Sequence, residues 1–114
     1  MANARADNLQ GALALLVLKT LMIHEPMHGW GITLHIQAVS QNVLQVEEGS
    51  LYPALYRMEK EGLISAEWGL SDNNRRARFY RITAAGRKRL EAEQRKWEAV
   101  AHAISLVLHS EATA

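Results

Sequence analysis

The chain has 114 residues, contains no cysteine and carries a formal net charge of +1. This length suits one folded domain, and the absence of thiols excludes disulfides, a thiolate nucleophile and a thiolate metal site. No apolar run approaches the ~20 residues of a membrane span and no signal-peptide pattern is present, so a cytoplasmic protein without membrane contact is expected.

The charges are distributed unevenly along the chain. Residues 75–96 carry nine basic and two acidic side chains, whereas the rest of the chain carries four basic and ten acidic ones. Such a concentration of positive charge is typical of a protein that binds a polyanion, although a charge run is more often a solvated helix face. Composition alone leaves both interpretations open.

The first periodic segment covers residues 9–24, and the spacing of its apolar side chains predicts a helix. One stripe consists of Leu9, Leu13, Leu16, Val17 and Leu21. A second stripe of Leu15, Leu18 and Met22 makes the helix apolar nearly all round, so we expect a partner subunit to cover part of it. Pro26 follows the segment and marks its end, because proline cannot continue a helix.

A short second helix is expected after His28, which would cap it or pack at its start. Its core-facing residues would be Ile32, Ile36 and Val39. The helix would end near residues 40–42, and an extended stretch, residues 43–46, would lead to the next element.

A third helix is predicted to begin between residues 48 and 50, because Pro53 is best tolerated in the first turn of a helix. Its core stripe would consist of Leu51, Leu55 and Met58. The side chains left to project from the core are those of Tyr52, Tyr56, Arg57 and Lys60. Gly62 supplies the stop signal.

Two strands are predicted at residues 63–68 and 77–82, joined by a polar, basic tip at residues 71–76. Thr83 is a natural N-cap for a long last helix, residues 84–108. The apolar stripe of this helix consists of Leu90, Trp97, Ala101, Ile104 and Leu108. Because the stripe extends beyond any core that so small a domain can form, we expect it to pair with the same helix of a second subunit.

Several segments of the sequence resemble the PadR family of transcriptional regulators. Residues 49–64 resemble its recognition-helix signature, and Arg75-Arg76 with residues 80–86 look like its wing and strand-to-helix junction. His28-Gly29-Trp30 is similar to its second-helix entry, where tyrosine is the more common third residue. The resemblance spans roughly residues 9–108 and fits the short subgroup, which has a single C-terminal helix.

The resemblance implies a mainly α fold with a small β-hairpin, a winged helix-turn-helix with a long C-terminal dimerisation helix. Residues 1–83 would form the DNA-binding region, with the first helix also contributing to the dimer, and residues 84–114 the dimerisation helix of one compact domain. The implied function is that of a homodimeric repressor, which occludes a promoter by binding double-stranded DNA at a pseudo-palindromic operator.

The expected DNA contacts lie on the third helix and the wing. They are Ser50, Tyr52, Pro53, Tyr56, Arg57, Arg75, Arg76 and Arg78. The wing arginines have no neighbouring carboxylate in the sequence beyond Asp72. Alternatives stay open for three of the helix residues: a helix cap for Ser50, a packing role for Tyr52, and a surface ion pair with Glu61 for Arg57.

The expected dimer interface consists of Leu9, Leu13, Leu16, Leu90, Trp97, Ala101, Ile104 and Leu108. By position, Trp97 resembles a tryptophan that lines a pore at the dimer centre of some multidrug-sensing PadR proteins and stacks on flat aromatic compounds. Trp97 is therefore a candidate for binding a small aromatic effector, and simple packing at the dimer core is the alternative.

No catalytic constellation, metal-site spacing or phosphate-binding loop is present, so neither an enzyme, nor a cofactor, nor a bound metal is expected. Two other functions fit the same elements. One is a winged-helix interaction module that uses its basic stretch to bind an acidic protein partner. The other is a regulator from a different winged-helix family.

Overall fold

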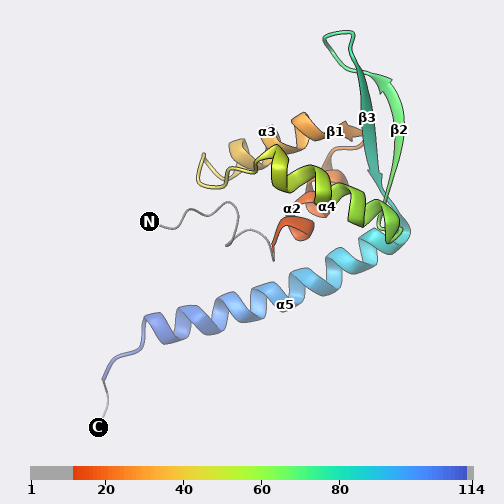
Figure 1. Cartoon of the computed structure of the whole chain (residues 1–114). Coiled ribbons are helices and arrows are strands. Elements are labelled where there is room, and N and C mark those ends of the chain that lie inside the picture. The colour runs from red at the N-terminus through yellow and green to blue at the C-terminus, as the bar shows by residue number, and fades with distance from the viewer. Residues whose placement is uncertain (1–11, 113–114) are drawn as a thin grey trace.

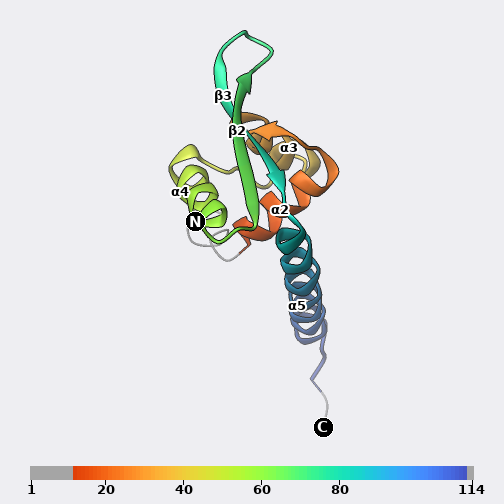
Figure 2. The ribbon, with the colours of Figure 1, turned by 90° about the vertical axis from the view of Figure 1, so that its right-hand side faces the viewer.

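The computed structural model describes residues 12–112 of the chain. The elements follow in the order α2 (Leu13–Ile23), β1 (Met27–His28), α3 (Gly29–Val39), α4 (Glu48–Lys60), β2 (Ile64–Leu70), β3 (Arg76–Ile82) and α5 (Ala84–Leu108). Helices α2, α3 and α4 pack together into a body. The β2–β3 hairpin projects from this body, and α5 extends away from it on the side opposite the hairpin tip (Figure 1). Figure 2, turned by 90°, shows hairpin and α5 at opposite ends of the molecule.

The core lies between the first three helices and the base of the sheet. Its completely buried side chains are those of Val17, Leu18, Leu21, Ile32, Leu51, Leu55 and Ile64. The predicted core stripe of α4, Leu51, Leu55 and Met58, is confirmed. Two expectations about the core are wrong. Leu18 is completely buried within the single chain and needs no partner subunit to cover it, and Val39, the last residue of α3, is 68% exposed.

The sheet has one more strand than the sequence predicted. Strand β1 pairs with β3, with Met27 opposite Tyr80 and His28 opposite Phe79, so the strand order is β1-β3-β2. Two residues are too short for the alternation that identifies a strand in a sequence. His28 also caps α3, as expected, because its Nδ1 accepts a hydrogen bond of 2.9 Å from the Gly31 amide.

Helix α4 begins at Glu48, inside the predicted bracket, but the reasoning from Pro53 is wrong. Pro53 is the sixth residue of α4 and lies beyond the first turn. A proline there leaves the carbonyl of Gly49 without its usual donor four residues later. Both residues are exposed, so water can satisfy that carbonyl and the helix continues.

The junction between β3 and α5 is built as predicted. The Thr83 hydroxyl accepts a hydrogen bond of 3.0 Å from the Gly86 amide, which makes Thr83 the N-cap of α5. The same hydroxyl donates to the Gly62 carbonyl at 2.6 Å, and the Thr83 amide donates to the Leu63 carbonyl at 3.1 Å. These bonds fix the start of α5 to the end of α4 and the start of β2.

Candidate nucleic-acid interface

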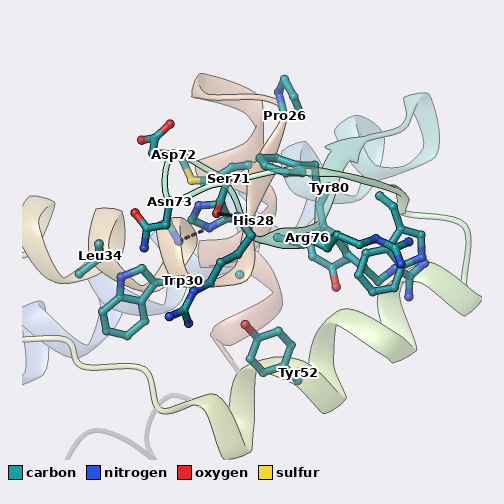
Figure 3. Close-up of a pocket in the computed structure, with 18 of the residues that line it drawn as sticks. Pro26, His28, Trp30, Leu34, Tyr52, Ser71, Asp72, Asn73, Arg76 and Tyr80 are labelled. Carbon is teal, nitrogen blue, oxygen red and sulfur yellow. Dashed lines mark hydrogen bonds between the residues drawn. The ribbon is translucent and has the colours of Figure 1, made fainter.

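A groove of about 1060 Å³ lies between the start of α3, the outer face of α4 and the β2–β3 hairpin. Tryptophan and tyrosine side chains from three elements line it, Trp30 on α3, Tyr52 and Tyr56 on α4, and Trp68 on β2, together with Phe79 and Tyr80 of β3. Arginines of the hairpin line its other wall: Arg75, Arg76 and Arg78. Figure 3 shows Trp30, Tyr52 and Arg76 around this space, each contributed by a different element. An aromatic and cationic groove suits a polyanion with flat bases.

The residues of α4 that were predicted to contact DNA lie on its outer face, and the helix-cap alternative for Ser50 needs correction. Tyr52, Pro53, Tyr56 and Arg57 are exposed, and Ser50 is partly buried. Ser50 is the third residue of the helix and Glu47 is the N-cap position, so the alternative of Ser50 as N-cap is wrong.

The ion pair considered for Arg57 is absent from the described residues. Glu61 lies 3.9 Å from Arg89 of α5 instead. The Arg57 guanidinium therefore stays available at the surface, one turn before the end of α4.

Tyr52 has both a packing role and an exposed edge. Its ring lies against Gly29, where an added Cβ would approach the Tyr52 hydroxyl oxygen to 2.6 Å, yet 43% of the residue remains exposed. Burial, followed by the carboxylate of Glu48, raises the pKa of the Tyr52 phenol. The hydroxyl therefore stays protonated at neutral pH and can donate a hydrogen bond to a phosphate oxygen.

The three wing arginines have different surroundings. Arg75 and Arg76 are exposed at the tip, and the Arg76 guanidinium carbon lies 4.7 Å from the centre of the Trp68 ring. The expectation that the wing arginines have no carboxylate beyond Asp72 is wrong for Arg78, whose Nη2 lies 2.8 Å from Glu59 Oε2 on α4. The partners are 19 residues apart, so only the folded chain reveals the pair.

The expected dimer residues fall into two groups. Leu13 and Leu90 lie in the core of the single chain, at 6% and 4% exposure, so neither has surface left for a partner. Leu16 is partly buried against that core, and Leu9 lies outside the described residues. The remaining expected residues of α5 form an exposed, mainly apolar stripe: Trp97, Ala101, Ile104 and Leu108. Helix α5 also exposes apolar residues that lie outside the expected set: Val100, Leu106 and Val107.

Residues 12–112 contain no group of three or more His, Asp or Glu side chains placed to hold a metal ion. Nor does any helix within this part of the chain have both the length and the apolar character needed to cross a membrane.

Comparison with known proteins gives a consistent result. Residues 17–92 match the family model described as "Transcriptional regulator PadR-like family". An uncharacterized protein of Lysinibacillus sphaericus is 31% identical over 105 residues, covering 91% of this chain and 94% of that protein. Transcriptional regulator Rv3488 of Mycobacterium tuberculosis is 37% identical over 78 residues, covering 68% of this chain and 69% of that protein.

Solved structures show the same similarity. A transcriptional regulator from Clostridium thermocellum has a TM-score of 0.78 at 27% identity, covering 88% of this chain and 96% of its own. A PadR-like transcriptional regulator from Bacillus cereus also has a TM-score of 0.78, at 28% identity, covering 93% of this chain and 100% of its own. The predicted fold class, a mainly α winged helix-turn-helix with a small β-hairpin and a long C-terminal helix, is confirmed, with β1 as an additional strand beside the hairpin.

Proposed function

Because the chain belongs to the PadR-like family of transcriptional regulators, we propose that it is a cytoplasmic homodimer that represses transcription by binding double-stranded DNA. Members of this family are regulators of transcription and not enzymes. The observation that carries the proposal is the position of Tyr52, Tyr56, Arg75 and Arg76 around one groove, with α4 on one side and the hairpin on the other.

In this proposal α4 enters the major groove and the hairpin contacts the flanking backbone. Residues 1–83 contain the DNA-binding region. The α4 contacts are Ser50, Tyr52, Pro53, Tyr56 and Arg57. Arg75 and Arg76 at the hairpin tip bind phosphate, and a pseudo-palindromic operator places one half-site under each subunit. Occupation of such a site within a promoter excludes RNA polymerase, which is the basis of repression.

Binding to DNA from immediately upstream of the protein's own gene tests the proposal. We expect fluorescence anisotropy to show tight binding that weakens steeply with salt and prefers the upstream duplex over a scrambled duplex by more than ~10³-fold. Weak binding that is indifferent to sequence would contradict a repressor of its own gene, and would mean that the operator lies elsewhere or that the basic stretch serves a protein partner. Capture of an acidic protein partner would then support the interaction-module alternative.

We propose that residues 84–114 carry the dimerisation helix and that the exposed stripe of α5 forms the interface. The variant Ile104→Glu should dissociate the dimer, because it places a charge in the middle of an apolar contact. Ile104 is 53% exposed in the single chain, so the fold of the subunit should survive. Analytical ultracentrifugation checks the mass, and circular dichroism checks the helix content.

Ala99→Glu is the matched control for this variant. Ala99 is exposed on α5 and, five residues before Ile104, lies on the opposite side of the helix from the stripe. The control should therefore remain dimeric. Equal dissociation of both variants would contradict an interface centred on the stripe.

We further propose that Trp97 binds a small, flat aromatic effector between the two α5 helices. Half of its surface is exposed in the single chain, at 51%. Trp97→Ala should abolish binding of a planar dye such as proflavine to the DNA-free protein, while the dimer persists. Dye binding that survives the substitution, or loss of the dimer together with dye binding, would leave Trp97 as a packing residue.

A further inference from the structure

The face of the hairpin that lines the groove carries three side chains in register. Trp68 of β2 lies directly opposite Arg78 of β3, and Arg76 is two residues from Arg78 and so points to the same face. The guanidinium carbons of Arg76 and Arg78 lie 4.7 and 6.0 Å from the centre of the Trp68 ring. The indole thus contacts both cations and limits the orientations that their side chains can adopt.

Arg78 forms an ion pair within the protein, with Glu59. Its Nη2 lies 2.8 Å from Glu59 Oε2, and the two side chains are 38% and 31% exposed. The Arg78 Nε is buried and has no hydrogen-bond partner. Glu59 belongs to α4 and Arg78 to β3, so the pair joins the hairpin to the helix across the groove.

Arg76 differs from Arg78 although both point to the same face. It is exposed, it lies closer to the indole, and among the described residues it has no carboxylate partner. A stacked guanidinium keeps its N–H donors free at the ring edge, so it can still bind a phosphate oxygen. The positive charge of Arg78, in contrast, is compensated by Glu59 before any DNA arrives.

On the basis of the proposed function, we propose that the wing arginines Arg76 and Arg78 have separate roles. Arg76, stacked on Trp68, binds a DNA phosphate, whereas Arg78 binds Glu59 and sets the position of the hairpin relative to α4. Glu59, Arg78 and Trp68 are positioning residues. A wing that is fixed in advance loses less conformational entropy on binding, and it holds α4 and Arg76 in one register on the duplex.

The salt dependence of DNA binding separates the two roles, because each phosphate contact contributes about 0.9 to the slope of log affinity against log salt. The phosphate-ligand variant is Arg76→Gln. The tether variant is the double substitution Glu59→Gln/Arg78→Met, which removes one charge of each sign and leaves no pair able to replace the bond. Both are compared with the wild type on the upstream duplex and on its scrambled control.

Arg76→Gln should reduce the slope by about 1.8 for a dimer, since two phosphate contacts are lost. The tether variant should keep the wild-type slope, bind the upstream duplex several-fold more weakly, and show a smaller preference over scrambled DNA. An equal reduction of slope in the tether variant would make Arg78 a phosphate ligand and overturn the assignment. An unchanged slope in Arg76→Gln would overturn the role of Arg76.

The DNA affinity of Trp68 variants provides a second test of the positioning role. Trp68→Ala should weaken DNA binding by about two- to fivefold per subunit, in keeping with one lost cation–π contact, and Trp68→Phe should restore most of the affinity because it keeps an aromatic ring. Equal affinity of Trp68→Ala and wild type would contradict the positioning role. Absence of any salt-dependent binding by the wild type would instead overturn the proposed function itself.

Discussion

Loss of both tip arginines, in the variant Arg75→Gln/Arg76→Gln, should weaken binding to the upstream duplex by about 10³-fold at about 0.1 M salt. A dimer would lose about four phosphate contacts, and the slope of log affinity against log salt would fall by about 3.6. Both residues are exposed at the end of the hairpin, far from the core, so the free energy of unfolding should fall by no more than the about 0.5–1 kcal/mol of the Arg76–Trp68 contact. Anisotropy at four or more salt concentrations measures the slope.

The matched control removes the same charge from another part of the basic stretch. Arg95 and Lys96 of α5 are exposed and lie 3.7 Å from Glu91 and Glu93, respectively. In Figure 1 the hairpin tip and α5 lie on opposite sides of the helical body. Arg95→Gln/Lys96→Gln should therefore change the slope little. A comparable reduction of affinity and slope in the control would mean that DNA binding depends on the overall positive charge of the protein rather than on contacts with the wing.

Elements with long, uninterrupted patterns were predictable from the sequence. The bounds of α5, residues 84–108, agree with the expectation, because a threonine cap precedes a run without proline in which one stripe of apolar residues repeats. The exposed face of α4 was equally accessible, since Leu51, Leu55 and Met58 occupy the buried face and leave Tyr52 and Tyr56 outside. In both helices the period of 3.6 residues in the apolar pattern predicts which face is buried and which is exposed.

Features that depend on tertiary contacts were not predictable. Strand β1 exists only because β3 offers an edge at Tyr80 and Phe79. The pair of Glu59 and Arg78 likewise depends on where the hairpin folds back toward α4. Leu90 follows the spacing of the α5 stripe, but it sits where α5 still contacts the body and so belongs to the core of one chain. A periodic pattern identifies an apolar face and not the surface that covers it.

The substitution Gly86→Ala should have the largest effect on the stability of the fold. A Cβ at this position would overlap the Leu63 carbonyl oxygen and lie 2.8 Å from Ile82 Cγ1. The Leu63 carbonyl is backbone and is held by the Thr83 amide at 3.1 Å, so it cannot move without loss of that bond. Relief of the overlap requires α5 to shift from the body, and we expect a loss of about 3 kcal/mol in the free energy of unfolding.

Gly49→Ala is the control that makes this expectation specific to the α5 junction. Gly49 lies in α4, and a Cβ there would meet no atom within 4 Å. Alanine should stabilise that helix by about 0.5–1 kcal/mol, since it lowers the entropy of the unfolded chain. Urea unfolding of both variants at one fixed protein concentration gives the comparison, because dimerisation makes the apparent stability depend on concentration. If Gly86→Ala unfolded at the wild-type midpoint, α5 would not be held against the Leu63 carbonyl. Its attachment to the DNA-binding region would then be looser than the close packing at Gly86 implies.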